Sequence, residues 1–274
     1  MNRNERLITG LLAIVVLATV ALTPAVVDAR PAYEIPVYYA TEGETLAAAD
    51  GEEWSRAAAV TVPLGSSGSA VPSSDDVSVE QMRIEAARTE SRLYLRLSWA
   101  DGTRDTSADE IREFADAVAV QMPANTSSRP PIAMGGPDNR VNVWYWAADG
   151  RSEELLAGGP GTTTPYEESQ VTTDATYSDG RWQVVFSRQL AAESQNRTAV
   201  PTQSDMDVAL AVWNGSNMER SGQKAVSEWY YLALGPDSGG PPYEIILWTV
   251  AGIGIVVTTL VTIQGVRRTR EGES

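Results

Sequence analysis

An alternating stretch, Arg92-Leu93-Tyr94-Leu95-Arg96-Leu97-Ser98-Trp99, decides the fold class of this 274-residue chain. Leu93, Leu95 and Leu97 occupy every second position, with polar or amphipathic side chains between them. Because successive side chains of a strand point to opposite faces of a sheet, this period of two predicts a β-strand with one face in a core. Residues 78–86 precede the stretch across a short polar gap and are its expected partner strand.

Similar short segments recur along the chain, and no long segment shows the 3.6-residue period of a helix. Ser178-Asp179-Gly180 predicts a hairpin turn, and residues 107–114 predict one short helix with Ser107 as its cap and Glu110 three residues later. We therefore expect an all-β fold, an antiparallel β-sandwich with few short helices and glycine-rich loops at residues 65–76, 123–140 and 150–170. Further strands are expected at residues 60–64, 117–122, 141–147, 170–177, 181–187, 206–213 and 227–234.

The chain contains neither cysteine nor histidine, which narrows its chemistry. Disulfides, zinc sites, iron–sulfur clusters and Ser-His-Asp triads are excluded, as are covalently attached haem and the commonest axial ligand of haem. A metal would have to be held by carboxylates, Met, Tyr, Lys or backbone oxygens. The formal charge of −15 argues against nucleic acid as a partner, because phosphate binding needs a basic surface. Acid excess with almost no lysine indicates a salt-adapted organism.

Both ends of the chain carry membrane signals. Residues 1–29 combine early arginines, an apolar run and the small-residue site Val27-Asp28-Ala29, which predicts a signal peptide cleaved after Ala29. An uncleaved anchor is the alternative, because the apolar run is long. Residues 245–264 predict one transmembrane helix, and residues 235–244 predict a linker between it and the body, residues 30–234. The arginine-rich tail, residues 265–274, places the C-terminus in the cytoplasm and the body on the extracytoplasmic side of the cell membrane.

Lys224 is the only lysine among 21 basic residues; the others are arginine. Lysine can lose its proton and present a lone pair, whereas guanidinium cannot. Lys224 is therefore a candidate for metal ligation, a Schiff base or general-base chemistry, and the alternative is a chance lysine with its ammonium in water. Met134 lies in a Pro- and Gly-rich loop, residues 130–137, where no hydrophobic period requires it. A thioether and an amine are both competent axial ligands for haem iron.

Several short motifs follow one another between residues 50 and 234. They are Leu93-Tyr-Leu-Arg-Leu-Ser-Trp-Ala-Asp101, Phe114-Ala-Asp-Ala-Val-Ala-Val-Gln121, the Met134-Gly-Gly loop, Val143-Trp-Tyr-Trp146, Gly180-Arg-Trp-Gln-Val-Val185, Ala211-Val-Trp-Asn-Gly215 and Lys224-Ala-Val-Ser227. In this order they resemble the haem b-binding gamma subunits of ethylbenzene dehydrogenase-like complexes, which belong with the type II dimethyl sulfoxide reductase family of molybdenum enzymes. In that family a β-sandwich holds one haem b between a Met and a Lys, which implies Met134 and Lys224 as the axial ligands.

The resemblance implies a membrane-anchored b-type cytochrome subunit that performs no substrate chemistry itself. It would pass electrons to or from the iron–sulfur (beta) subunit of a complex whose molybdenum (alpha) subunit acts on nitrate, dimethyl sulfoxide, chlorate, selenate or a hydrocarbon. With both axial positions filled, the iron has no open position, which suits electron transfer. The predicted C-terminal anchor departs from the secreted family members and leaves the quinone or cytochrome partner open.

Two other groups of residues suggest alternative functions, a carbohydrate-binding module and an enzyme. Asp50-Gly51-Glu52-Glu53-Trp54 resembles the start of family 9 carbohydrate-binding modules, which also use Trp side chains as platforms for sugars. Most Trp residues of the body are nevertheless expected to fill the core. An enzyme could use the acids Asp101, Asp105, Asp109 and Asp116, but scattered carboxylates in an acidic chain are expected to be solvated.

Overall fold

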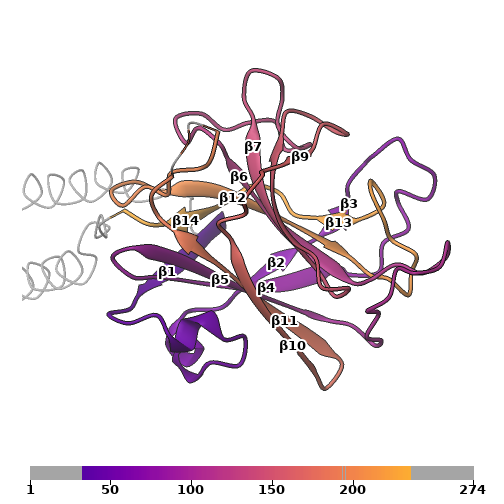
Figure 1. Cartoon of the computed structure of the whole chain (residues 1–274), viewed down its shortest axis with the longest axis horizontal. Coiled ribbons are helices and arrows are strands. Elements are labelled where there is room, and N and C mark those ends of the chain that lie inside the picture. Colours follow the sequence, from indigo (N-terminus) through magenta and orange to yellow (C-terminus); the bar gives the residue numbers. More distant parts are fainter. Residues whose placement is uncertain (1–32, 193, 195, 236–274) are drawn as a thin grey trace, which may run out of the picture. The chain divides into compact units, whose positions relative to one another are not determined.

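The computed structural model describes residues 33–192, 194 and 196–235, which form a β-sandwich (Figure 1). The predicted signal peptide, transmembrane helix and cytoplasmic tail lie outside the described residues, as does the predicted linker apart from Gly235. Within the described part of the chain, no helix is both long and apolar enough to cross a membrane.

The elements follow one another as short strands with two 3-10 turns near the start. In chain order they are β1 (Glu34–Tyr39), η2 (Thr45–Ala47), η3 (Glu52–Arg56), β2 (Val60–Pro63), β3 (Gly65–Ser66), β4 (Gln81–Arg88), β5 (Arg92–Ala100), β6 (Ala117–Pro123), β7 (Val141–Ala147), β8 (Ser152–Ala157), β9 (Thr164–Pro165), β10 (Thr172–Ser178), β11 (Arg181–Gln189), β12 (Met206–Trp213), β13 (Ala225–Val226) and β14 (Tyr230–Ala233). The expected all-β class is confirmed.

Hydrogen bonds connect the strands in the order β10-β11-β5-β4-β1-β14-β12-β6-β7-β8-β9, with β2 beside β4 and β13 between β12 and β3. The start of β1 pairs with β14 and its end pairs with β4, so β1 links two layers. We call β10, β11, β5, β4 and β2 the first layer, and β14, β12, β6, β7, β8 and β9 the second (Figure 1). Both pairings of β1 are parallel. The other strand pairs of the described residues are antiparallel, as expected, and β1, which no short hairpin joins to its partners, is the exception.

The core lies between the two layers. Leu93, Leu95, Leu97 and Trp99 of β5 all have exposed fractions of 0%, as the alternation of their stretch predicts. The second layer contributes Val118, Val120, Trp144, Val208, Leu210 and Val212 to the same cluster. Trp99, Trp144, Trp146 and Trp182 all belong to it, so the expectation that these indoles fill the core is confirmed. Each large buried side chain contributes about 1.5–3 kcal/mol through removal of apolar surface from water.

The predicted helix over residues 107–114 is absent, and this segment is irregular with one turn. Ser107 does not cap a helix. Its hydroxyl instead donates to the carboxylate of Glu113 at 2.7 Å. Ile111 is 96% exposed, so the segment has no apolar stripe that helix formation would bury. The expected loop over residues 150–170 in turn contains β8 and β9, which continue the second layer from β7.

A buried ion pair joins the two layers. Arg188 of β11 has no exposed surface, and its Nη1 lies 2.9 Å from Oε1 of Glu154 on β8. The same nitrogen donates to Oδ1 of Asn142 on β7 at 3.0 Å, and Nη2 donates to the carbonyl of Thr198. Nε of Arg197 lies 3.2 Å from the other oxygen of Glu154. One carboxylate therefore compensates two guanidinium groups.

We predict that Glu154→Gln lowers the free energy of unfolding by about 3–5 kcal/mol, because it leaves buried guanidinium charge uncompensated. Urea denaturation of the purified chain measures this. Glu153→Gln is the matched control: it removes the same charge from the adjacent, half-buried position of β8, which faces the other side of the sheet. It should change stability by less than ~1 kcal/mol. Equal losses in the two variants would contradict a special role for Glu154.

Candidate functional site

A second apolar cluster covers the outer face of the second layer, away from the core between the layers. We call it the outer apolar surface. Its buried members are Ala119, Val141, Val143, Ala157, Ala209 and Trp229, and Met134, Tyr145, Leu155, Ala211 and Trp213 pack against them half-buried. Met134 from the β6–β7 loop thus lies on the same surface as residues of β12, β6 and β7.

Small side chains form the floor of this surface. The register places Ala211 of β12 opposite Ala119 of β6, and Ala119 opposite Tyr145 of β7. The rings of Tyr145 and Trp213 meet edge to face with their centres 5.7 Å apart. Small side chains on β12 and β6 are thus bordered by large aromatic rings on this face. The sequence carries a signal for this floor, alanine at the alternating positions 209 and 211.

The β6–β7 loop holds Met134 in a left-handed backbone conformation. Its φ is 62°, a value that residues other than glycine seldom adopt. The N–H of Met134 donates to the carbonyl of Ile132 at 2.8 Å, and its carbonyl accepts from the N–H of Gly159 at 2.9 Å. A Cβ on the following Gly135, whose φ is 75°, would lie 2.8 Å from the carbonyl oxygen of Asn139. The Gly-rich sequence is therefore needed for the close backbone approach that fixes the thioether.

Lys224 is held by contacts on both sides. It directly precedes β13, which pairs with β12 and with β3. The carbonyl of Lys224 accepts from the N–H of Ser67, at the end of β3, at 3.2 Å. The indole N–H of Trp213 donates to the carbonyl of Ser221 at 3.2 Å, which ties the turn before Lys224 to the end of β12. The backbone that presents the amine is therefore anchored to two strands.

The amine of Lys224 and the thioether of Met134 meet on the outer apolar surface. Nζ lies 3.8 Å from Sδ, although 90 residues separate them in sequence. Nζ also lies 5.0 Å from the centre of the Trp213 ring, and it has no ion pair with any carboxylate of the described residues. Burial lowers the pKa of Lys224, because desolvation disfavours the ammonium form. The half-buried amine therefore lies against a thioether and an indole ring, the setting expected of a ligand more than of a fully hydrated surface lysine.

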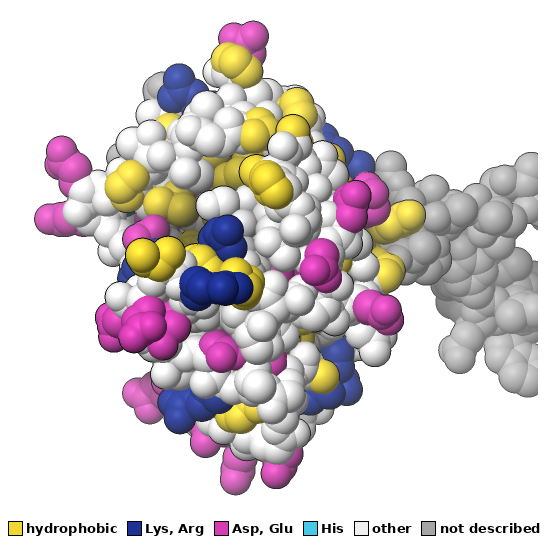
Figure 2. Space-filling view, turned by 90° about the vertical axis from the view of Figure 1, so that its right-hand side faces the viewer, with side chains coloured by type: hydrophobic (Ala, Val, Ile, Leu, Met, Phe, Trp, Pro, Cys, Tyr) yellow, Lys and Arg dark blue, Asp and Glu magenta, His cyan; other side chains and the backbone are white. Residues whose placement is uncertain are grey.

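Acidic side chains do not gather at this position. Figure 2 shows the side of the molecule on which β3 and β13 lie in Figure 1; hydrophobic side chains and a few Lys or Arg side chains lie near its middle, and acidic side chains lie mostly below them and to the sides. Hard cations prefer oxygen ligands, whereas thioether and amine ligands suit softer transition metals. An amine and a thioether are donors that the iron of a haem could accept, and Lys224 and Met134 would be the residues that hold it.

The acidic residues considered as enzyme groups lie elsewhere. Asp101 and Asp116 are 3% and 0% exposed, so the expectation that they are solvated is wrong for these two. Asp105 is half-buried beside them, and Asp109 is exposed. Their burial could not be predicted, because the groups that cover them come from distant parts of the chain.

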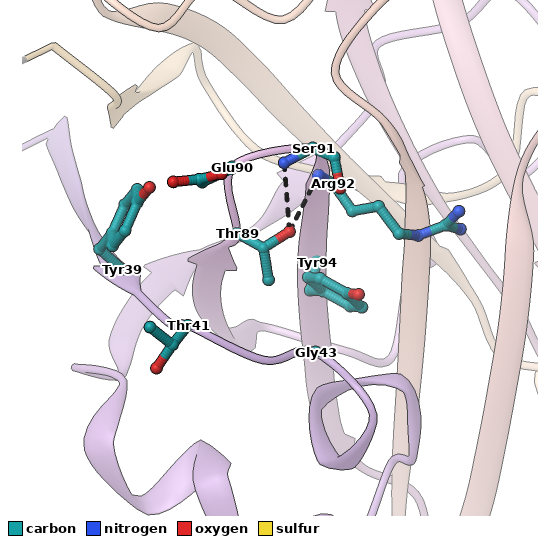
Figure 3. A pocket seen from close by; sticks show the side chains of 8 residues that line it. All are labelled: Tyr39, Thr41, Gly43, Thr89, Glu90, Ser91, Arg92 and Tyr94. Atoms are coloured by element: carbon teal, nitrogen blue, oxygen red, sulfur yellow. Dashed lines mark hydrogen bonds between the residues drawn. The ribbon is translucent and has the colours of Figure 1, made fainter.

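A polar pocket of about 320 Å³ lies beside the β4–β5 turn and does not include Met134 or Lys224 (Figure 3). The hydroxyl of Thr89 in this pocket already accepts hydrogen bonds from the N–H groups of Ser91 and Arg92, at 3.3 and 3.1 Å. This hydroxyl stabilises the turn, and we assign the pocket no function.

Comparison with known proteins gives consistent results. The sequence profile described as ethylbenzene dehydrogenase matches residues 52–170 and 158–225. A "putative respiratory nitrate reductase heme subunit ORF7" of Haloferax mediterranei is 54% identical over 270 residues, covering 97% of this chain and 98% of the relative. The chlorate reductase subunit gamma of Ideonella dechloratans is 37% identical, covering 56% of this chain and 64% of its own length. The dimethylsulfide dehydrogenase subunit gamma of Rhodovulum sulfidophilum is 34% identical, with coverages of 61% and 66%.

Solved structures resemble the chain only distantly. A putative carbohydrate-binding protein from Bacteroides uniformis has a TM-score of 0.47 and 8% identity, covering 73% of this chain and 98% of that chain. A family 9 carbohydrate-binding module from Caldicellulosiruptor kristjanssonii has a TM-score of 0.45 and 10% identity, with coverages of 75% and 95%. Likeness at this level carries no argument about this chain. The profile match and the sequence relatives do: the chain belongs to the ethylbenzene dehydrogenase family, together with the haem and gamma subunits named above.

Proposed function

We propose that this chain binds one haem b between Met134 and Lys224 and transfers electrons within a molybdenum oxidoreductase complex. The observation that carries the proposal is the 3.8 Å contact between Nζ of Lys224 and Sδ of Met134, made across 90 residues in a chain without histidine. Family membership supports a haem, because one relative is named a haem subunit. The absence of cysteine excludes covalent attachment through thioether bonds and so favours the b type.

The protein's part is to supply two ligands that need little rearrangement. Lys224 binds a metal only as the neutral amine, and the apolar setting that lowers its pKa favours that form. Met134 binds without losing a proton, and its loop already directs it to the amine. The alanine floor and the rings of Tyr145 and Trp213 would exclude water beside the ligands. When bound, the haem would supply one-electron oxidation and reduction, and Met134 and Lys224 would be the residues that hold its iron.

The relatives indicate the kind of complex. Two of them are named gamma subunits, of chlorate reductase and of dimethylsulfide dehydrogenase. We therefore place this chain beside an iron–sulfur (beta) subunit and a molybdenum catalytic (alpha) subunit, with no substrate chemistry of its own. The relative that covers 97% of the chain is named for respiratory nitrate reductase, which favours nitrate as the terminal acceptor of the complex.

We also propose that the body lies outside the cell membrane and is tethered by its C-terminal segment. The proposal rests on the signal-like residues 1–29, the uncharged run within residues 245–264 and the arginines that flank both segments. Electrons would then reach the complex at the outer surface of the membrane.

Absorption spectra can test whether Met134 and Lys224 bind haem iron. The purified chain should absorb as a low-spin haem protein, and Met134→Ala should yield a five-coordinate or water-ligated iron. Lys224→Arg should be as damaging as Lys224→Ala, because guanidinium offers no lone pair. Met218→Ala is the matched control, since Met218 also has a positive φ, of 56°, and lies in the loop before Lys224. A colourless chain, or Lys224→Arg with the parent spectrum and haem content, would refute the proposed ligation.

Ligation by Lys224 should depend on pH. Lowering the pH favours the ammonium form of Lys224, so the low-spin spectrum should be lost on acidification as the amine leaves the iron. Lys224→Met would replace the amine with a thioether that has no proton to gain in this range. It should stay low-spin at pH values where the parent does not. Absorption spectra recorded during parallel acid titrations provide the measurement, and identical curves for the two proteins would argue against lysine ligation.

Protease treatment of intact cells can test on which side of the membrane the body lies. Protease added to intact cells should digest the body and spare an epitope tag placed after residue 274, because the arginine-rich tail is expected in the cytoplasm. Immunoblots of the tag should show a short protected fragment. A body that stays intact until the cells are lysed would contradict export.

A further inference from the structure

The turn that precedes Lys224 is tight and holds two residues in unfavourable backbone conformations. Arg220 and Gln223 face each other as an isolated antiparallel pair, and the N–H of Gln223 donates to the carbonyl of Arg220 at 2.9 Å. Ser221, between them, has a φ of 52°, and Met218, just before the turn, has a φ of 56°. Residues other than glycine seldom adopt these left-handed values and keep them only where surrounding contacts fix them. Contacts outside the turn must therefore hold its shape.

Glu219 lies within this segment as a buried carboxylate. Its exposed fraction is 1%, and it forms no ion pair with an arginine or lysine of the described residues. A buried charge without a counter-charge is costly unless hydrogen-bond donors surround it. The donors around Glu219 therefore show what this carboxylate holds together.

The carboxylate of Glu219 accepts four hydrogen bonds from three segments. Its Oε1 accepts from the N–H and the hydroxyl of Ser78, at 2.8 and 2.9 Å, and from the side-chain amide of Asn217 at 3.1 Å. Its Oε2 accepts from the N–H of Asn214 at 3.0 Å. Ser78 lies just before β4, Asn214 directly follows β12, and Asn217 belongs to the connection that leads to the turn. One side chain thus ties this connection to two strands in different layers.

Only a carboxylate suits this arrangement of donors. Both oxygens of an ionised Glu accept hydrogen bonds, whereas an amide has one oxygen that accepts and one NH2 group that donates. In Glu219→Gln the NH2 group would face either the N–H of Ser78 or the N–H of Asn214, whichever way the amide is turned. Two donors would then face each other in a buried position, which costs the desolvation penalty of both groups. The position therefore requires the acid and not merely a side chain of its size.

The same turn connects Glu219 to the backbone of Lys224. The two residues lie directly outside the Arg220–Gln223 pair, one on each arm of the turn. The side-chain amide of Gln223 also donates to the carbonyl of Asp76 at 3.0 Å, in the segment before β4. A displacement of the arm that carries Glu219 would therefore move the arm that carries Lys224. No ion pair joins the two side chains, so the effect of Glu219 on the amine is transmitted by the backbone.

We propose that Glu219 is a positioning residue that fixes this turn so that the amine of Lys224 meets the thioether of Met134. The 3.8 Å contact between Nζ and Sδ belongs to an arrangement that the buried carboxylate maintains. The consequence for haem binding rests on the proposed function, whereas the effect on the position of Lys224 does not. Loss of the carboxylate would leave the turn several arrangements, and a ligand that must first be ordered binds more weakly.

Nuclear magnetic resonance can follow the position of Lys224 directly. Because Lys224 is the only lysine, labelling with 15N-lysine gives one backbone amide signal from the purified full chain. In the chain without haem, Glu219→Gln should shift this signal or divide it into several. Ser78→Ala is a milder variant, because it removes only the hydroxyl donor and changes an exposed residue. It should shift the signal in the same direction by a smaller amount.

The chain loaded with haem provides a second measurement. Glu219→Gln should weaken haem affinity by about 10-fold or more, as is typical when a group that supports a metal ligand is removed. Its absorption spectrum at neutral pH should move from the low-spin spectrum of the parent toward that of Lys224→Ala. Glu154→Gln is the matched control for stability, because it also removes a buried carboxylate but lies on β8, outside the turn. It should keep the lysine signal and the spectrum of the parent.

The positioning role is overturned if Glu219→Gln keeps the lysine signal of the parent. It is equally overturned if Glu154→Gln changes the lysine signal as much, which would indicate a general loss of stability. Should Glu219→Gln not fold, Ser78→Ala decides, and an unchanged lysine signal in that variant contradicts the proposal. A parent without a low-spin spectrum would refute the proposed haem ligation instead, and the lysine signal without haem would still decide the role of Glu219.

Discussion

The buried guanidinium of Arg188 is the constraint on which the arrangement of the two layers depends. A charge with no exposed surface must have partners, and those of Arg188 come from β8, from β7 and from Thr198 in the connection between β11 and β12. Any sliding of one layer over the other would separate charges in a medium that cannot solvate them. The apolar core provides most of the driving force but tolerates many arrangements, whereas the ion pair specifies one. The second layer is therefore held in a fixed position, with its outer face free to carry a site.

That outer face differs from the core in the size and arrangement of its side chains. The core is filled by large indoles and leucines, while the outer apolar surface has alanines at its centre and aromatic rings at its border. Loops that are far apart in sequence bring one thioether and one amine to it. Each loop is pinned by backbone hydrogen bonds, so the loops are positioned by the sheet beneath them. The proposed site therefore lies on the outside of a layer, where the strands supply a floor and the loops supply the donors.

Sequence predicted the parts of the fold that follow from local patterns. The bounds of β7 and β12 agree with their predicted ranges, because alternating apolar residues mark them clearly. The pairing of β1 could not be predicted, because it depends on both layers being present. The predicted helix at residues 107–114 rested on a local capping signal, and such signals do not suffice where the segment has no apolar face to bury.

The candidate site was predictable to a similar extent. Lys224 and Met134 stood out because each is unexpected where it occurs, the one in an arginine-rich chain and the other in a Gly-rich loop. No local sequence pattern predicts that the two side chains meet near Trp213, because their contact depends on the tertiary fold. The burial of Asp101 and Asp116 was missed for the same reason, since Trp182 and Gly215 supply donors from 66 and 99 residues beyond Asp116.

The solitary lysine has a practical consequence. Acylating reagents attack neutral amines, and apart from the α-amino terminus this chain offers them a single target. Its lowered pKa makes the amine more reactive once reached, while half-burial against Met134 limits access to it. The extent of acylation at Lys224, measured by mass spectrometry, therefore reports how accessible this amine is to the reagent. Lys224 can thus serve as an accessibility probe in the native protein, with no engineered label.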